Sequence, residues 1–186
     1  MRNVVFAINT TLDGCCDHTK FGPDAETFPY ITGLIRDADT FVFGRKTYQL
    51  MVPYWPDVAK EPAQQTKASY EFAQAFVAVD KIVVFSRSID QVEEKNTRIV
   101  RTNLQDEILK LKQEDGKNIF IGGITISSQL AELGLIDEYH FVVHPTVVGE
   151  GRRVFEGINL PEKLQLKLVE SKIFKSGTVV LRYLKQ

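Results

Sequence analysis

The sequence predicts an α/β fold in which helices cover a mainly parallel sheet and antiparallel strands close one of its edges. In the first two thirds of the chain, short apolar runs alternate with amphipathic segments, which is typical of repeated strand and helix units. In the last third, strand-like runs follow one another, and Lys175-Ser176-Gly177 forms a tight turn between the last two. The 186 residues contain no repeat, low-complexity tract or linker, so we expect residues 1–186 to form one domain.

Each element follows from its local hydrophobic pattern and from the residues that end it. Strands of the parallel part are expected at Val4–Ile8, Thr40–Phe43, Lys81–Phe85, Arg98–Arg101 and Asn118–Ile121. Helices are expected at Tyr30–Arg36, Lys46–Met51, Thr66–Val79, Leu104–Gln113 and Thr125–Leu133. Antiparallel strands are expected at Glu138–Val148, Leu164–Phe174 and Thr178–Leu184.

Two segments lack a regular pattern. Asn9–Pro29 contains the turn pairs Asp13-Gly14 and Gly22-Pro23, and an irregular connection of this length usually carries function. Pro53–Pro62 contains Trp55 and three prolines, and it is expected to be a rigid surface excursion.

The composition excludes several classes of partner. Lys and Arg total 23 against 24 Asp and Glu, so the net charge of −1 gives no general attraction to nucleic acid or to a membrane surface. Cys15 and Cys16 are adjacent, which disfavours a disulfide between them and indicates free thiols in a reducing cytosol. No apolar stretch reaches the ~18 residues of a membrane span, so a cytoplasmic protein is expected.

Three strand ends carry residues that suit phosphate. Gly44-Arg45-Lys46-Thr47, Ser86-Arg87-Ser88 and Gly122-Gly123 each follow an apolar run that we interpret as a buried strand. Glycine lets a backbone approach a ligand closely, hydroxyls and amides at a helix start attract phosphate, and arginine adds a charged fork. Ligands of an open α/β sheet bind at the carboxyl ends of its strands, so the three segments together predict a nucleotide site.

Each of these segments alone is also typical of an ordinary turn, cap or loop. None is a G-x-G-x-x-G or a G-x-x-x-x-G-K-[ST] motif, which excludes the Rossmann fingerprint and the P-loop. His140 and His144 point the same way on one predicted strand, but no third ligand lies within reach of them and His18 is remote in sequence. No metal site is therefore expected.

These features occur in the order of a known superfamily. The ordered segments are Leu12-Asp13-Gly14, Arg36-x-x-Asp39, Gly44-Arg45-Lys46-Thr47-Tyr48, Ser86-Arg87, Ile121-Gly122-Gly123, His144-Pro145 and Gly149-x-Gly151. The chain resembles the dihydrofolate-reductase-like superfamily, and within it the stand-alone proteins similar to the C-terminal reductase domain of the bifunctional riboflavin-biosynthesis deaminase/reductase. The resemblance implies a three-layer fold and a reductase that transfers a hydride from NADPH to a small heterocyclic substrate.

The resemblance also implies which residues hold NADPH. Thr47 and the amides near Lys46 would meet the pyrophosphate, while Arg45 and Arg87, with Ser86, would hold the 2′-phosphate. The other residues expected at the cofactor are Ala7, Ile8, Gly44, Ser88, Gly122, Gly123, Ile124, Thr125 and Ile126. By the same resemblance, the Gly122-Gly123 peptide is expected to be cis.

The substrate is less closely defined. The resemblance first implies a 5-amino-6-(5-phosphoribosylamino)uracil reductase, but the Asp-Pro-x-Leu segment usual in those enzymes is missing after Thr47. A dihydrofolate or pterin-type reductase and a nucleotide-binding sensor without turnover are the alternatives. Reduction of a C=N bond needs a proton, and the candidates to supply it are Asp13 first and Glu26 second, with Asp24 in the same loop.

A homodimer is also expected. The run Tyr139–Val148 is more apolar than an exposed sheet edge normally is, so it predicts a partner surface on the C-terminal strands. The other expected partners are small molecules, namely the substrate and the cofactor.

Overall fold

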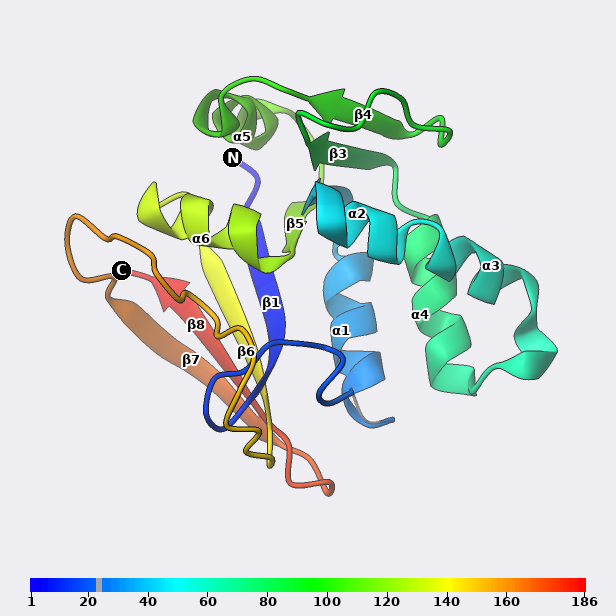
Figure 1. The fold of residues 1–186 in the computed structure, drawn as a ribbon, viewed down its shortest axis with the longest axis vertical. Helices are drawn as coiled ribbons and strands as arrows, with labels where there is room; N and C mark the ends of the chain where they lie inside the picture. The colour runs from blue at the N-terminus through cyan, green and yellow to red at the C-terminus, as the bar shows by residue number, and fades with distance from the viewer. Residues whose placement is uncertain (23–24) are drawn as a thin grey trace.

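The computed structural model of the chain describes residues 1–22 and 25–186 and confirms the predicted α/β fold. Its eight-stranded sheet has the order β4-β3-β2-β5-β1-β6-β8-β7 (Figure 1). The parallel strands are β1 (Val4–Thr11), β2 (Ala38–Gly44), β3 (Lys81–Phe85), β4 (Thr97–Val100), β5 (Asn118–Gly122) and β6 (Glu138–His144). β8 (Val179–Lys185) runs antiparallel to β6 and to β7 (Leu166–Ile173), as the sequence predicted for the C-terminal strands.

Helices cover both faces of the sheet, which gives the predicted three layers (Figure 1). The helices packed on one face are α1 (Thr27–Arg36), α2 (Arg45–Met51), α3 (Tyr54–Lys60) and α4 (Lys67–Val77). The helices on the other face are α5 (Leu104–Gln113) and α6 (Ile124–Glu132). None of the helices in the described part of the chain has the length and apolarity that a bilayer span requires.

Alternation along the central strands produces two cores. Val4 and Phe6 of β1 pack beneath α5 and α6, whereas Val5 and Ala7 face α1 to α4. Because both faces of these strands are covered, their sequences are continuous apolar runs rather than alternating ones. Such a continuous run shows where a strand lies. Because it does not alternate, it does not show which residues face which layer of helices.

The segment Pro53–Pro62 is not the irregular excursion that the sequence suggested. It forms α3, followed by a short 3₁₀ helix at Pro62–Gln64. Pro53 precedes α3 and Pro56 lies in its first turn, where a missing N–H removes no intrahelical hydrogen bond. The prolines therefore start a helix at a defined position instead of preventing one.

Most of the apolar run used to predict a homodimer lies inside the sheet as β6, whereas residues 145–148 follow that strand and Val147 is exposed. β6 pairs with β1 on one side and β8 on the other, and the buried Tyr139 packs edge-on against Phe6 with ring centroids 6.2 Å apart. The part of the run within β6 is therefore explained within one chain. The homodimer stays a prediction. The exposed large apolar side chains of the C-terminal strands are Leu168, Val169 and Ile173 of the edge strand β7 and Leu184 of β8.

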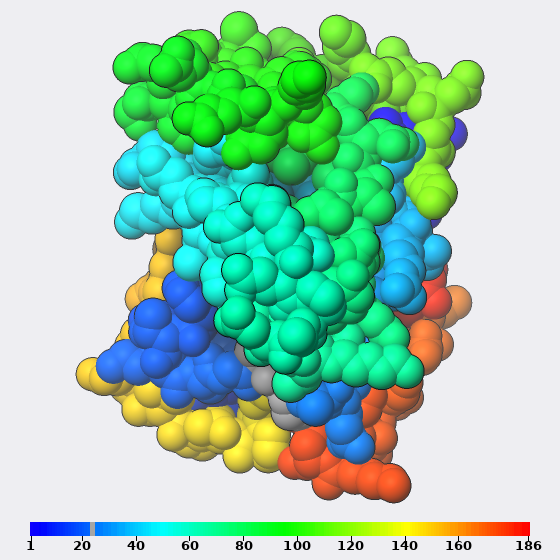
Figure 2. Space-filling view, turned by 90° about the vertical axis from the view of Figure 1, so that its right-hand side faces the viewer, coloured from blue at the N-terminus to red at the C-terminus, as the bar shows by residue number. Residues whose placement is uncertain are grey.

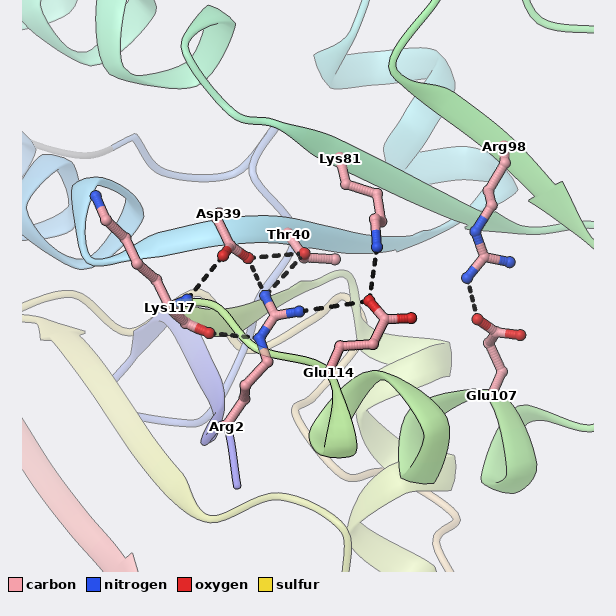
Figure 3. A network of polar contacts seen from close by, with 8 residues as sticks. All are labelled: Arg2, Asp39, Thr40, Lys81, Arg98, Glu107, Glu114 and Lys117. Carbon is pink, nitrogen blue, oxygen red and sulfur yellow. Dashed lines mark hydrogen bonds and ion pairs between the residues drawn. The ribbon is translucent and has the colours of Figure 1, made fainter.

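A buried guanidinium ties together the amino ends of three neighbouring strands (Figure 3). Arg2, just before β1, donates hydrogen bonds to the carboxylate of Asp39 in β2 and to the Thr40 hydroxyl, the latter at 2.9 Å. Its Nε donates to the carbonyl of Lys117, just before β5, at 2.6 Å, and the Lys117 amide donates to Asp39 at 2.7 Å. The network continues to β3, because Glu114 lies 3.9 Å from Arg2 and 2.7 Å from Lys81.

We expect Asp39→Ala to lower the free energy of unfolding by about 3–5 kcal/mol, because it leaves the Arg2 charge buried without its carboxylate partner. The Arg2 side chain is only 4% exposed. Urea unfolding followed by circular dichroism measures the change. Asp57→Ala is the matched control, because the Asp57–Lys60 pair is exposed and its loss should cost less than about 1 kcal/mol. Equal losses in both variants would contradict the role of the clamp.

Candidate active site

The three phosphate-suited segments lie on adjacent strands. They follow β2, β3 and β5, which are neighbours in the sheet and run parallel, so their carboxyl ends meet at one edge. α2 begins directly after Gly44, and α6 begins directly after Gly123. The topology thus confirms the shared edge that the sequence predicted, while binding of a nucleotide there stays a prediction.

A cavity of about 450 Å³ opens at this edge, between the sheet and α1 to α4. Its floor includes Ala7, Phe43 and Phe120 from β1, β2 and β5. The lining residues that are also exposed, His18, Leu50 and Tyr54, mark its mouth. Figure 2 shows this face of the molecule, with the loop after β1 in blue below α2 in cyan.

Gly122 and Gly123 form one end of the cavity, and neither has room for a side chain. A Cβ atom on Gly122 would lie 2.6 Å from the Phe43 ring, and one on Gly123 would collide with the Thr47 hydroxyl. Gly123 also has a φ of +90°, in the left-handed region that favours glycine. The turn between β5 and α6 therefore packs directly on α2 and brings Thr47 to the cavity wall.

The cis peptide predicted between Gly122 and Gly123 is wrong, because the described residues contain no cis peptide. The chain changes direction instead through the positive φ of Gly123, where β5 ends and α6 begins. The close approach to Phe43 and Thr47 is achieved by the absence of two side chains.

The other end of the cavity is aromatic. Trp55 of α3 packs against Phe72 of α4 with ring centroids 4.3 Å apart. Phe28 of α1 meets both rings edge-on, at 6.3 Å from Trp55 and 5.7 Å from Phe72. Tyr54 lies edge-on to Trp55 at 5.0 Å and continues the aromatic wall to the mouth. Three helices thus contribute one cluster of rings around the space.

Asn9 is a polar side chain of the cavity that the sequence analysis missed. It follows Ala7 on the same face of β1, and its Oδ1 lies 3.0 Å from Nε2 of the buried His144 in β6. An amide oxygen only accepts hydrogen bonds, so Nε2 of His144 donates this one. The apolar run in the sequence predicts a strand that ends at Ile8, which places Asn9 in a loop. In the structure the strand continues to Thr11, with Ala7, Asn9 and Thr11 on one face.

The predicted cofactor residues divide between the cavity and the surface beside it. Ala7 and Thr47 line the cavity, whereas Ile8 packs against the core beneath α5 and α6. The residues exposed along the edge are Arg45, Lys46, Arg87, Ser88 and Thr125. Arg45 donates to the Gln49 side chain at 3.1 Å, and Arg87 forms no hydrogen bond or ion pair with the described residues.

Three other predicted residues, Ser86, Gly44 and Ile126, have structural roles at this edge. The Ser86 hydroxyl accepts hydrogen bonds from the amides of Ser88 at 3.2 Å and Ile89 at 3.0 Å, so it orders the turn after β3. A Cβ atom on Gly44 would lie 3.2 Å from the buried Ile126, so Gly44 permits α6 to pack beside the start of α2. Both roles depend on contacts between distant segments.

A guanidinium that the sequence analysis missed also reaches this edge. Arg152, in the segment after β6, donates to the Thr125 hydroxyl in the first turn of α6 at 3.3 Å. Ile124 precedes Thr125 at the start of that helix. The only sequence signal was proximity to Gly149-x-Gly151, which does not identify Arg152 itself.

Asp13 holds the loop after β1 in place. Its carboxylate accepts hydrogen bonds from the Thr11 hydroxyl at 2.5 Å and from the amides of Gly149 at 2.8 Å and Val148 at 3.3 Å. These bonds, led by that of Thr11, lower the pKa of Asp13 to about 2. Its carboxylate is therefore ionised near neutral pH, which suits an anchor better than a proton donor, and its catalytic role stays a prediction.

The other two candidate carboxylates are placed differently. Glu26 precedes α1, and its carboxylate accepts a hydrogen bond at 2.9 Å from the amide of Ser176 in the turn between β7 and β8. Neither Asp13 nor Glu26 is among the described residues that line the cavity. Asp24 lies outside the described residues.

A buried polar chain joins α1 to the sheet beside the cavity. The Tyr30 hydroxyl lies 2.6 Å from Nδ1 of His140, and Nε2 of His140 lies 2.6 Å from Oε1 of Glu138. Arg182 donates to the same Glu138 oxygen at 2.7 Å. The hydrogen bond from His140, followed by that from Arg182, lowers the pKa of Glu138 to about 2. This chain fixes the position of α1, whose Phe28 and Ile31 line the cavity.

Comparison with known proteins identifies the family. The sequence matches the RibD C-terminal domain over residues 2–180. The chain belongs to this family. The uncharacterized protein YyaP of Bacillus subtilis (strain 168) is 29% identical over 190 residues, which cover 98% of this chain and 94% of YyaP.

Two solved structures show the same fold as this RibD C-terminal domain. A protein of Shewanella sp. PV-4 superposes with a TM-score of 0.72 and 20% identity, covering 100% of this chain and 99% of that one. The diaminohydroxyphosphoribosylaminopyrimidine deaminase/5-amino-6-(5-phosphoribosylamino)uracil reductase of Thermotoga maritima superposes with a TM-score of 0.69 and 17% identity. That match covers 100% of this chain and 57% of the Thermotoga protein. The family and fold that the sequence predicted are thereby confirmed.

We expect Gly122→Ala to lower the free energy of unfolding by about 1–3 kcal/mol, because the added methyl group would overlap the Phe43 ring. Chemical denaturation measures the loss. Gly33→Ala in α1 is the matched control, because no atom lies within 4 Å of the new methyl group and alanine favours a helix by up to about 1 kcal/mol. An unchanged free energy of unfolding in Gly122→Ala would contradict the close contact and show that the turn accommodates a side chain.

Acid should remove the stabilisation that Glu138 provides. The folded pKa of about 2 lies below the ordinary 4.5, so the ionised carboxylate contributes fully above that ordinary value and its contribution is lost as the pH falls toward 2. The melting temperature of the unmodified protein should therefore fall more steeply between about pH 5 and pH 3 than that of Glu138→Gln. Glu162→Gln is the control, because Glu162 is exposed. If the melting temperature of Glu138→Gln fell with pH as steeply as that of the unmodified protein, Glu138 would not be the source of the acid sensitivity.

Proposed function

We propose that this RibD C-terminal domain protein is an NADPH-dependent reductase that transfers a hydride to a small ring substrate. The observation that carries the proposal is the cavity beside Gly122, Gly123 and Thr47, at the edge where three neighbouring parallel strands end. The family match and the word reductase in the name of the Thermotoga relative agree with this chemistry.

The residues at the edge fit a nicotinamide dinucleotide. The exposed guanidiniums of Arg45 and Arg87 suit phosphate, and the Arg152 guanidinium lies beside the first turn of α6. Thr47 would bind near the pyrophosphate, and Ala7 would meet the nicotinamide end through its backbone. When bound, the dihydronicotinamide supplies the hydride. The role of the protein would then be to hold the nicotinamide and the substrate ring in one cavity and to exclude water from them.

Two substrates remain candidates for this reaction. A phosphoribosylaminouracil is suggested by the name of the Thermotoga relative, but the described lining of the cavity contains no Lys or Arg to hold a phosphate. A pterin would need a carboxylate at its ring, and the described lining contains no Asp or Glu. A nucleotide-binding sensor is the alternative outcome if the cofactor binds and no substrate is reduced.

We expect the protein to bind NADPH more tightly than NADH, because a guanidinium can grip the 2′-phosphate with two hydrogen bonds. Arg87→Ala should cost roughly 1.5–3 kcal/mol of NADPH binding and leave NADH binding nearly unchanged. Calorimetric titration with each cofactor measures both. Arg36→Ala at the opposite, amino end of β2 is the control, and equal affinity of the unmodified protein for the two cofactors would contradict the assignment.

The role of Asp13 can be separated from that of a proton donor. If Asp13 holds the substrate or delivers the proton, Asp13→Asn should lower turnover by about a hundredfold or more while NADPH binding stays intact. Because its pKa of about 2 keeps it ionised, we expect the pH dependence of the remaining turnover to keep its shape. Loss of one limb of the pH profile would make Asp13 the proton donor. Full activity in Asp13→Asn with loss in Glu26→Gln would instead favour a pterin-type reductase.

A further inference from the structure

The substrate class of the cavity can be narrowed from its lining. Its far end is built from Phe28, Trp55 and Phe72, with Leu50, Met51 and Tyr54 leading to the mouth. The rings lie at several angles to one another, and all of them line the cavity. Such walls gain most from a flat apolar ligand that fills the space between them.

Charge is absent from the described lining of this cavity. Its polar groups are those of Asn9, His18, Thr47, Tyr54 and Trp55. His18 and Tyr54 lie at the exposed mouth, and the Trp55 indole N–H donates to the Met51 sulfur at 3.4 Å. A phosphate brought among the rings would lose its water without gaining a cation or a set of amides. The exposed guanidiniums of Arg45 and Arg87 are not among the lining residues. The ring end therefore discriminates against an anionic ligand.

Asn9 supplies the cavity with a fixed hydrogen bond donor. Its Oδ1 is engaged by Nε2 of His144 at 3.0 Å, and the orientation of the amide is thereby set. The Asn9 side chain lines the cavity, so its remaining NH₂ group is the part available to a ligand there. His144 is itself buried, which makes this orientation costly to reverse. A ligand seated beside Asn9 should therefore present a hydrogen bond acceptor.

We propose that the cavity binds an uncharged, planar conjugated ring compound whose carbonyl oxygen accepts a hydrogen bond from the Asn9 amide, in preference to a phosphorylated riboside. The proposal rests on the proposed reductase function only for the assignment of the Ala7 end of the cavity to the nicotinamide. Asn9 follows Ala7 on the same face of β1, so the acceptor would lie near that end while the ring extends toward Trp55 and Phe72. His144 acts on the ligand through Asn9 and is a positioning residue.

Calorimetric titration with three probes tests this without requiring turnover. The probes are chromone, which is a planar conjugated ketone, naphthalene, which lacks the carbonyl, and uridine 5′-monophosphate, which is a phosphorylated pyrimidine riboside. We expect chromone to bind at least about tenfold more tightly than the nucleotide. Asn9→Leu should weaken chromone binding by about tenfold and change naphthalene binding by less than about twofold. Trp55→Ala should weaken both uncharged probes, which locates them in this cavity.

Two results would overturn the proposal. One is binding of uridine 5′-monophosphate as tight as that of chromone and in competition with it. The other is an equal effect of Asn9→Leu on chromone and naphthalene, which would give Asn9 no role toward the carbonyl. Each protein is also assayed for NADPH oxidation. If the binding pattern holds and no conjugated carbonyl compound is reduced, the ligand class stands and the proposed reductase function fails.

Discussion

The Arg2 guanidinium is the constraint on which the rest of the sheet depends. It joins the amino ends of β1, β2 and β5, which are the three central strands of the parallel sheet. A buried cation is stable only with its full set of partners, so it permits one alignment of these strands. β2 and β5 also end side by side, because Phe43 near the end of β2 is paired with Gly122 at the end of β5. The edge that holds the cavity is thus set from the far side of the molecule.

The sequence was sufficient for the fold and for the edge, because both depend on local patterns and on their order. Gly44, Ser86 and Gly122 each end an apolar run, and a parallel sheet necessarily brings such ends to one side. The strand positions followed in the same way from short apolar segments. The family resemblance added the three-layer arrangement, which no periodicity contains.

What the sequence could not supply arises from contacts between distant segments. The role of Asn9 depends on His144, which is 135 residues away, and nothing near Asn9 indicates that contact. Asp13 was the first candidate for the proton donor, but its carboxylate accepts hydrogen bonds from the amides of Val148 and Gly149, which lie far away in sequence. Trp55 reached the cavity because the prolines around it start a helix, whereas their local signal is that of a turn.

The two adjacent thiols of the loop after β1 are shielded from reagents in different ways. Cys15 is fully buried and pairs with Arg153 in a β-bridge, while the Cys16 sulfur lies 3.1 Å from the Arg152 carbonyl. Burial raises the pKa of Cys16 to about 11, so hardly any thiolate exists at neutral pH. Peroxide and alkylating agents attack the thiolate. Of the two cysteines in this loop, Cys15 is thus shielded by burial, whereas the partly exposed Cys16 is held as the protonated thiol.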